Sequence, residues 1–269
     1  MTLILSGKEL AEKIKAEIRQ ETAGLVRAPK LCSIVIGDCS SSLKYSQRKE
    51  KLFQQLGLGY ELKHLSKDDT GLQELIYEIN KDATIDGIMI HYPLPDDFDP
   101  EEVASMIDPE KDIEGLNPYS HFEPCTAKAV MRLLEEYEIE ISWKQAVVIG
   151  RSRIVGGPVY EMLLARDATV SVCHSKTSKE TLDYLCREAE IIVTATGKPG
   201  LITAEMVSAK AVIIDAGTNY VKGKLFGDVD SVIYGKVKAL SPVPGGVGPL
   251  TNLMAAKNLL AAYRMRKNE

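Results

Sequence analysis

Two short stretches of the sequence carry side chains suited to acid–base chemistry. In SSSLKYSQRKEK, Tyr45 and Lys49 stand four residues apart on a predicted helix, so both side chains lie on one face of it. In GIMIHYPLPDD, a short apolar strand ends in His91 and breaks at once on a Pro-Leu-Pro turn. A lysine on a helix is usually a solvated surface residue, and a histidine at the end of a strand can simply be a polar residue without a catalytic role. Each of these residues therefore has both a catalytic and a purely structural interpretation.

The stretch VVIGRSRIVGGP indicates a second kind of chemistry, the binding of phosphate groups. Gly150 closes a predicted strand and Gly156 opens a predicted helix, with Ser152 between them. A loop of this kind brings the backbone close to a pyrophosphate and offers the N–H groups of a helix N-terminus, as in the dinucleotide-binding fingerprint. The alternative is an ordinary glycine turn between a strand and a helix.

The stretch SPVPGGVGPLT is the most unusual in the chain. Its glycines, from Gly245 to Gly248, expose successive backbone N–H groups, and Pro249 suits the first position of a helix. Because glycine leaves no side chain in the way, such a loop can lie against a ligand. We therefore predict ligand contact here.

The residues that follow the next predicted strand bear on the choice of dinucleotide. A site for NAD usually places a carboxylate about 20 residues beyond the fingerprint, against the ribose 2′-hydroxyl. Here the chain reads Cys-His-Ser-Lys-Thr from Cys173 to Thr177, and the fingerprint loop adds Arg151 and Arg153. Hydroxyl and cationic groups suit a 2′-phosphate, so the sequence favours NADP over NAD. Lys176 can also belong to a solvated polar turn.

Alternating strand and helix patterns must position these residues. LCSIVIG is a continuous apolar run typical of a strand buried on both faces, and Leu10, Ile14 and Ile18 repeat every four residues after Ser6. The predicted elements of the first half are a helix after Ser6, strands at 31–37, 60–65 and in GIMIH, and helices at 42–56 and 71–81. Those of the second half are strands at 145–150, 168–173, 190–196 and 211–217, and helices at 155–165, 178–187 and 249–264.

This alternation predicts an α/β fold with two parallel sheets, each covered by helices. Between the halves lies IDPEKDIEGLNPYSHFEPCTA, which is rich in turn formers and which we interpret as the inter-domain connection and a cleft wall. We expect a first domain at 1–120, a Rossmann-type dinucleotide-binding domain at 121–249, and a C-terminal helix at 250–269 that returns to the first domain.

Composition narrows the class of protein. The chain has 269 residues, a net charge of −5 and no block of basic residues, which argues against nucleic acid as a partner. Its five cysteines are scattered and form no CxxC pair, so neither a disulfide framework nor a metal site is indicated, and a reduced, cytoplasmic setting fits. We see neither a signal peptide nor an apolar stretch long enough to span a membrane. For Cys39 and Cys125 we favour packing over reactivity.

Taken together, these motifs resemble the methylenetetrahydrofolate dehydrogenase/methenyltetrahydrofolate cyclohydrolase family. The resemblance covers nearly the whole chain and rests on SSSLKYSQRK, GIMIHYPLP, DPEKDIEGLN, PCTA, GRSRIVGGP, CHSKT, GDVD and PVPGGVGPLT. It implies a folate-binding first domain, a cleft between it and the Rossmann domain, and a homodimer. It also implies hydride transfer from 5,10-methylenetetrahydrofolate to NADP, followed in many members by hydrolysis of the methenyl product to 10-formyltetrahydrofolate.

The resemblance also implies roles for individual residues. Lys49 is the expected proton-transfer residue, Tyr45 the residue that stacks on the substrate's aminobenzoate ring, and His91 the third catalytic residue. The expected substrate-binding residues are Ser42, Tyr45, Pro93, Leu94, Pro95, Glu114, Pro244 and Gly245. The expected cofactor-binding residues are Gly150, Arg151, Ser152, Ile154, Val155, Gly156, His174, Ser175, Thr177, Thr196, Gly197, Gly217, Gly248 and Thr251.

The chain departs from the family pattern mainly on the folate side. His91 stands where the family usually has glutamine, and Glu114 where it usually has the second aspartate of Lys-Asp-Val-Asp-Gly. These changes leave the dehydrogenase as the expected activity and the cyclohydrolase open. The alternatives are a dehydrogenase without cyclohydrolase activity, a Rossmann dehydrogenase for a different small substrate such as shikimate or an amino acid, and a catalytically silent folate or nucleotide sensor.

Overall fold

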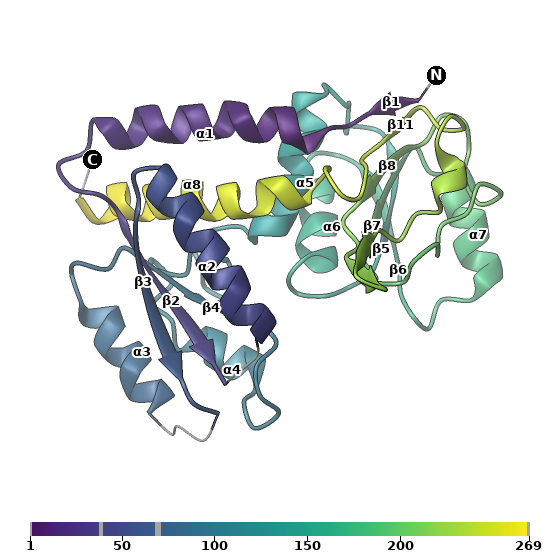
Figure 1. Ribbon diagram of the computed structural model, residues 1–269. Helices are drawn as coiled ribbons and strands as arrows, with labels where there is room; N and C mark the ends of the chain where they lie inside the picture. The colour runs from purple at the N-terminus through teal and green to yellow at the C-terminus, as the bar shows by residue number, and fades with distance from the viewer. Residues whose placement is uncertain (1, 38–39, 68–70, 268–269) are drawn as a thin grey trace. The chain divides into compact units, whose positions relative to one another are not determined.

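The chain forms two compact α/β units, each built around its own parallel sheet (Figure 1). The structure, a computed structural model, describes residues 2–37, 40–67 and 71–267, so that Cys39 lies outside the described residues. The three-stranded unit comprises Lys13–Cys125 and Asn252–Glu269, and the six-stranded unit comprises Met1–Glu12 and Thr126–Thr251. The predicted two-domain α/β fold is confirmed.

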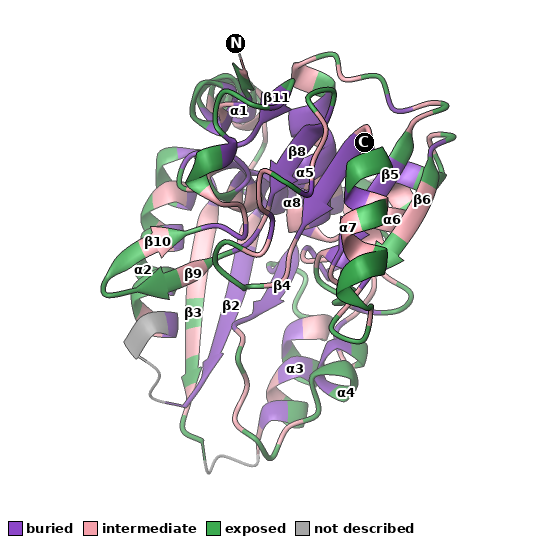
Figure 2. Ribbon diagram, turned by 90° about the vertical axis from the view of Figure 1, so that its right-hand side faces the viewer, coloured by how far each residue is buried: buried purple, intermediate pink, exposed green. Residues whose placement is uncertain are grey.

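The three-stranded unit holds the sheet that carries Met89 and leads to His91. Its strands are β2 (Lys30–Ile36), β3 (Gly59–Leu65) and β4 (Gly87–Ile90), and its helices are α2 (Ser40–Gln55), α3 (Leu72–Lys81), α4 (Pro100–Ser105) and most of α1 (Gly7–Ala23) and α8 (Gly248–Lys267). The strand order is β3-β2-β4, and all pairs are parallel. The central strand β2 is almost wholly buried, as its unbroken apolar run predicts, whereas the edge strand β3 is partly exposed (Figure 2).

Alternation along β2 and β4 divides their side chains between two faces of this sheet. Isoleucines of both strands, among them Ile34 and Ile90, pack with the apolar side of α3 in one core. Ser33, Met89 and His91 occupy the intervening positions and therefore point to the opposite face. Since burying one isoleucine contributes roughly 1.5–3 kcal/mol, the isoleucine face fixes the register, and the register fixes where the polar groups emerge.

The six-stranded unit has the strand order β1-β11-β8-β7-β5-β6 with parallel pairing throughout. Its strands are β1 (Leu3–Ile4), β5 (Gln145–Ile149), β6 (Thr169–Cys173), β7 (Ile191–Thr194), β8 (Val212–Asp215) and β11 (Ala239–Leu240), and its helices are α5 (Cys125–Glu136), α6 (Gly156–Leu164) and α7 (Lys179–Glu188). The chain runs from β5 outward to β6 and then back to β7 on the other side. This reversal is the topological switch point at which doubly wound sheets bind ligands, beyond the carboxyl ends of the strands.

The predicted return of the C-terminal helix is confirmed. Within the three-stranded unit, Lys257 of α8 forms ion pairs with Glu17 and Glu21 of α1, at 2.9 and 2.7 Å. Asn258 is fully buried and donates to the backbone oxygen of Ile113. The helix is thus tied both to α1 and to the loop that leads to Glu114.

Some elements escaped the sequence prediction. The helix α5 starts at the end of the segment interpreted as a connection, although Ala127, Val130, Met131 and Leu134 repeat with helical spacing and are buried. The short helix α4, the hairpin of β9 (Asn219–Val221) and β10 (Lys224–Phe226), the 3-10 helix Ser231–Ile233 and the two-residue strands β1 and β11 were not predicted. These elements are too short to show a period.

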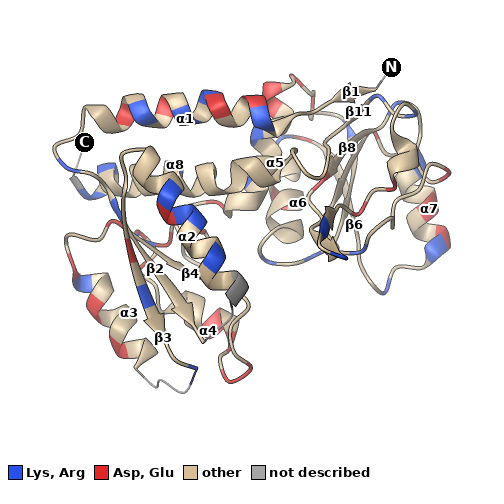
Figure 3. Ribbon diagram, viewed as in Figure 1, with Lys and Arg blue, Asp and Glu red and all other residues tan. Residues whose placement is uncertain are grey.

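Charges of both signs are mixed on the helices of the part of the chain that the structure describes (Figure 3). Lysines and arginines are interspersed with acidic residues on α1 and α3 (Figure 3). None of the described helices is long and apolar enough to cross a bilayer. Within the described ranges, no group of three or more His, Cys, Asp or Glu side chains is arranged to hold a metal ion.

Candidate active site

Lys49 is buried against the face of the three-stranded sheet that carries Ser33, Met89 and His91. Its side chain is 2% exposed, and its Nζ lies 2.6 Å from Sδ of Met89 in β4 and 3.8 Å from Oε1 of Glu114. The Nζ atom also lies 5.2 Å from the centre of the Tyr45 ring, one helical turn earlier on α2. The interpretation of Lys49 as a solvated surface residue is therefore wrong.

This environment acts on the charges of both Lys49 and Glu114. Burial lowers the pKa of Lys49 because the ammonium ion loses its water, and the nearby carboxylate of Glu114 opposes that effect. Burial likewise raises the pKa of Glu114, against the influence of Lys49. Burial and the carboxylate of Glu114 therefore act in opposite directions on the pKa of Lys49, and such opposed shifts are common at functional sites.

His91 and Tyr45 lie next to this lysine. The two rings meet edge to face with their centres 5.8 Å apart, and Nε2 of His91 lies 2.7 Å from Oγ of Ser33. Burial, and then the positive charge of Lys49, lower the pKa of His91 to about 4. Tyr45 keeps 42% of its surface exposed and donates a hydrogen bond of 2.7 Å to Oδ1 of Asn252. An exposed ring face beside a buried amine suits the stacking role expected of Tyr45.

The segment from Lys111 to Glu114 contains three charged residues, of which only Glu114 reaches the lysine. Lys111 is buried and donates to the backbone oxygens of Ile79 and Asp82. Asp112 is buried and accepts the backbone N–H of Asn117. The first two charges therefore hold the loop, and the third faces Lys49.

The remaining predicted residues of this unit lie nearby in the chain. Ser42 is buried on α2, one turn before Tyr45 and Ser46. After His91 the chain turns at Pro93, which follows a cis peptide bond, and Pro95, while Leu94 packs on the isoleucine core.

The fingerprint loop of the six-stranded unit has the close packing that its glycines predict. A Cβ on Gly156 would lie 2.2 Å from the backbone oxygen of Gly150, so only glycine lets α6 begin this close to the end of β5. Ser152 shapes the loop, because its Oγ accepts the N–H of Val155 and its backbone oxygen accepts that of Gly157.

A cavity of about 470 Å³ opens beside this loop, at the carboxyl ends of β5, β6 and β7. The predicted cofactor residues that line it are Gly150, Arg151, Ser152, His174, Ser175, Thr177 and Thr196. Those outside its lining are Ile154, Val155, Gly156, Gly197, Gly217, Gly248 and Thr251. A glycine-lined cavity with hydroxyl groups and an arginine fits a dinucleotide.

The loop of Gly245 and Gly246 also has a structural role. The N–H of Gly7 donates to the oxygen of Gly245 at 2.8 Å, and a Cβ on Gly7 would lie 1.8 Å from the oxygen of Gly246. The glycines therefore let two backbones touch at the start of α1. Pro244 is exposed and follows a cis peptide bond.

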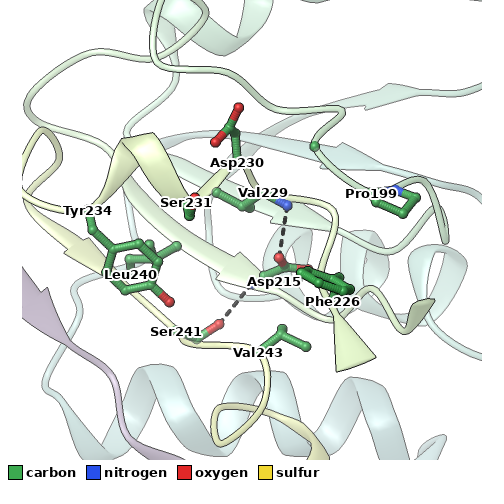
Figure 4. Close-up of a pocket in the computed structure, with 12 residues that line it drawn as sticks. Pro199, Asp215, Phe226, Val229, Asp230, Ser231, Tyr234, Leu240, Ser241 and Val243 are labelled. Atoms are coloured by element: carbon green, nitrogen blue, oxygen red, sulfur yellow. Dashed lines mark hydrogen bonds between the residues drawn. The ribbon is translucent and has the colours of Figure 1, made fainter. Parts of the chain in front are cut away.

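A second cavity, of about 340 Å³, lies over the carboxyl end of β8 (Figure 4). The carboxylate of Asp215 accepts the backbone N–H groups of Gly217, Asp228 and Val229, and its own N–H donates to Ser241. Burial raises the pKa of Asp215 to about 6, although these N–H groups oppose it. Because this carboxylate holds the surrounding loops, we interpret it as structural.

Sequence reasoning missed several residues of both sites. In the three-stranded unit these are Met89, Asn252 and Ser33; the alternation in GIMIH was the available signal for Met89. In the six-stranded unit, Lys179 and Asp183 of α7 line the first cavity, and Oδ1 of Asp183 is buried with no hydrogen-bond partner among the described residues. A carboxylate is thus present near the strand end where the sequence showed none.

Fold and cavity define the six-stranded unit as a Rossmann-type dinucleotide-binding domain, joined to a smaller α/β unit with a buried lysine. The catalytic-domain model of the tetrahydrofolate dehydrogenase/cyclohydrolase family matches residues 5–114, and the NAD(P)-binding-domain model of the same family matches residues 124–267. The chain belongs to the tetrahydrofolate dehydrogenase/cyclohydrolase family. This membership decides against a dehydrogenase of the shikimate type.

Individual relatives agree with this assignment over their full length. The bifunctional protein FolD of Halothermothrix orenii is 40% identical over 281 residues, covering 98% of this chain and 99% of the relative. The crystal structure of the bifunctional FolD enzyme of Campylobacter jejuni is 36% identical, with a TM-score of 0.95 and coverage of 99% and 100%. The FolD enzyme of Trypanosoma brucei, solved with NADP cofactor and an inhibitor, is 32% identical, with a TM-score of 0.93 and coverage of 100% and 99%.

Proposed function

We propose that this protein oxidises 5,10-methylenetetrahydrofolate to the 5,10-methenyl form with NADP, and then hydrolyses that product to 10-formyltetrahydrofolate. The observation that carries the proposal is the buried Lys49, held between Met89 and Glu114 in the unit that matches the family's catalytic domain. A buried amine beside a carboxylate is an arrangement typical of sites that transfer protons, which favours an enzyme over a sensor.

The oxidation requires mainly the alignment of two rings. Bound NADP would accept the hydride from the methylene carbon of the substrate. The chain contributes positioning: Tyr45 offers a ring face, Glu114 a carboxylate for N–H groups of the substrate, and Ser42 lies one turn before Tyr45 on the same helix. We also include Pro93, Leu94, Pro95, Pro244 and Gly245 in the proposed substrate site.

The hydrolysis requires a proton acceptor. Water adds to the methenyl carbon, the bond from that carbon to N5 breaks, and the formyl group stays on N10, with one proton taken up by N5 and one released. Lys49 in its neutral form accepts a proton from the attacking water, and burial favours that form. His91, adjacent to Lys49 and Tyr45, lies at the same site.

The residues of the cofactor cavity support NADP as the preferred dinucleotide. Arg151, Ser175 and Lys179 line it and can bind a 2′-phosphate. Asp183 lines it too, and a carboxylate there would instead suit a ribose hydroxyl or the adenine amino group. NAD is therefore the alternative, and the two cofactors must be compared directly.

The test of the function measures the two half-reactions separately with purified protein. We expect NADPH absorbance to rise with methylenetetrahydrofolate and the absorbance of methenyltetrahydrofolate to fall without any cofactor. Lys49→Gln should slow the hydrolysis by roughly 100-fold or more, as loss of a general base does, while folate still binds in calorimetry. NADPH formation without hydrolysis would mean that the protein is a dehydrogenase without cyclohydrolase activity. Folate binding without either reaction would mean that the protein binds folate but does not catalyse.

The test of cofactor preference is Arg151→Ala. Loss of one charge-assisted contact to a phosphate should raise the KM for NADP by about tenfold and leave that for NAD nearly unchanged. Arg187→Ala, which changes an exposed arginine of α7 outside the cavity, is the control. Equal effects of Arg151→Ala on both cofactors would contradict a 2′-phosphate site.

Three further assignments belong to this proposal. We assign folate binding to residues 1–120 with 250–269 and dinucleotide binding to 121–249. The family-model matches to 5–114 and from 124 onward support the boundary near residue 120, and the compact unit that contains both Lys13–Cys125 and Asn252–Glu269 supports the place of the last helix. We expect a homodimer, which light scattering on a size-exclusion column can test. We expect a cytoplasmic location, because the described cysteines are free thiols and free thiols are usual in a reducing compartment.

A further inference from the structure

The Tyr45 ring has neighbours on several sides within the three-stranded unit. Its hydroxyl donates a hydrogen bond of 2.7 Å to Oδ1 of Asn252. It meets the ring of His91 edge to face, with the centres 5.8 Å apart and the planes at 80°. Nζ of Lys49 lies 5.2 Å from its centre. The ring therefore has a defined orientation, although 42% of the residue is exposed.

These contacts differ in how tightly they restrict the ring. Edge-to-face pairs are favourable over centre distances from about 4.5 to 7 Å, so the contact with His91 permits tilting. The hydroxyl is the part of the side chain farthest from the backbone of α2, and O–H···O bonds weaken steeply as their geometry departs from the optimum. Because a phenolic O–H prefers the plane of its ring, an acceptor in a fixed place restricts both the swing and the rotation of the ring. Asn252 is therefore the contact that can set the plane of Tyr45.

Asn252 is itself fixed by the helix that carries it. It lies in the second turn of α8 and is partly buried. Further along, α8 is tied to α1 by Lys257 and to the loop that leads to Glu114 by Asn258. An asparagine amide offers both an acceptor and donors, so it can bond the hydroxyl in either orientation of the amide. The partner of Tyr45 thus stands on an anchored helix other than α2.

We propose that Asn252 is a positioning residue, which holds the hydroxyl of Tyr45 and so fixes the ring face on which the aromatic ring of the substrate stacks. This inference rests on the proposed function, because it concerns the binding of folate beside Lys49. Asn252 acts through Tyr45 and does not touch the reacting carbon. Its loss should therefore weaken substrate binding and leave the chemical steps nearly intact.

The first test is a double-mutant cycle, measured as the binding of tetrahydrofolate by calorimetry. Asn252→Leu and Tyr45→Phe each remove one side of the hydrogen bond and should each weaken binding about fivefold, as loss of one neutral hydrogen bond implies. The double variant should bind about as weakly as either single variant, because both changes remove the same contact. Wild-type affinity in Asn252→Leu, or effects that multiply to about 25-fold in the double variant, would overturn the proposal.

The kinetics of NADPH formation separate positioning from general damage to the protein. Asn252→Leu should raise the KM for methylenetetrahydrofolate about fivefold, with kcat and the KM for NADP close to those of the wild type. Met265→Leu changes an exposed residue near the end of α8, and Tyr77→Phe removes the hydroxyl of an exposed tyrosine of α3. Both are controls and should leave every constant unchanged. An equal rise of the KM for NADP in Asn252→Leu, or a fall of kcat as large as the rise in KM, would refute the positioning role.

The orientation of the ring can also be observed without any reaction. The edge-to-face contact brings ring protons of Tyr45 and His91 close enough for a nuclear Overhauser effect, and His91→Gln assigns this signal by its disappearance. We expect the signal to lose intensity in Asn252→Leu, where the ring is free to tilt, and to persist in Met265→Leu. An equally intense signal in Asn252→Leu would mean that the ring is held without Asn252, and the proposal would be wrong.

These measurements separate failure of this inference from failure of the proposed function. A protein that binds tetrahydrofolate and shows the coupled pair, but catalyses neither reaction, would keep the role of Asn252 and discard the function. An active protein in which Asn252→Leu binds folate as the wild type does would keep the function and discard the role of Asn252. A wild-type protein that does not bind tetrahydrofolate would discard both.

Discussion

Replacing His91 by glutamine should make the folded state less sensitive to mild acid. The imidazole is 5% exposed, and burial together with the charge of Lys49 lowers its pKa from 6.5 to about 4. Between these two pH values the unfolded chain binds a proton on this ring that the folded chain does not bind. Stability therefore falls as the pH falls from 6.5 toward 4, and the wild type carries this loss while the glutamine variant does not.

The size of the effect follows from the same two values. At about 1.4 kcal/mol per pH unit, the interval from 6.5 to about 4 corresponds to about 3 kcal/mol in the limit of low pH. At about pH 5 the same linkage gives about 2 kcal/mol, and near pH 7 it is close to zero.

The assay is urea unfolding followed by circular dichroism at about pH 7 and about pH 5. The wild type should lose about 2 kcal/mol more between these conditions than His91→Gln, and titrating groups common to both proteins cancel in the comparison. Ile90→Val, a buried neighbour without a titrating group, is the control and should lose as much as the wild type. Equal acid losses in the wild type and His91→Gln would refute the lowered pKa and the buried environment behind it.

Two other changes test the electrostatics of the sites. Glu114→Asp withdraws the carboxylate that lies 3.8 Å from Lys49, so the pKa of Lys49 should fall further. The acid limb of the pH–rate profile for hydrolysis should then move to lower pH. An acid limb that does not move would show that Glu114 and Lys49 are not coupled. Asp228 is fully buried and accepts hydrogen bonds from Thr194, Thr196, Lys198 and Asn219, so Asp228→Ala should lower the free energy of unfolding by about 3 kcal/mol or more in urea titrations. A loss below about 1 kcal/mol would mean that water replaces the carboxylate without cost.

Much of the fold could be predicted because its signals are local. The apolar run at 31–37 corresponds to β2 (Lys30–Ile36), and the helix predicted at 249–264 corresponds to α8 (Gly248–Lys267). The loop from Gly150 to Gly156 was predicted for the same reason, since the close approach of α6 to β5 requires glycine itself. By contrast, β1 and β11 are two residues each and exist only because they pair with each other and with β8.

The sites were only partly predictable because their residues meet through folding. Lys49 was recognised by resemblance alone, since nothing in its own helix shows that it is buried. Glu114 was named with the substrate residues, but its distance from Lys49 depends on a loop held by Asp112 and Asn258. Asp183, on α7, enters the cofactor cavity from an element that the fingerprint does not include.

By itself, the sequence determined the two α/β halves, the glycine loops and the strand that delivers His91, because hydrophobic period and glycine spacing are properties of neighbouring residues. Only the tertiary structure decided that Oγ of Ser33 lies 2.7 Å from Nε2 of that histidine, and Oγ of Ser46 2.7 Å from the hydroxyl of Tyr60. Ser33 and His91 are 58 positions apart, and the parallel register of β2 and β4 brings them together. Register depends on the burial of a whole face, so no short stretch of sequence contains it.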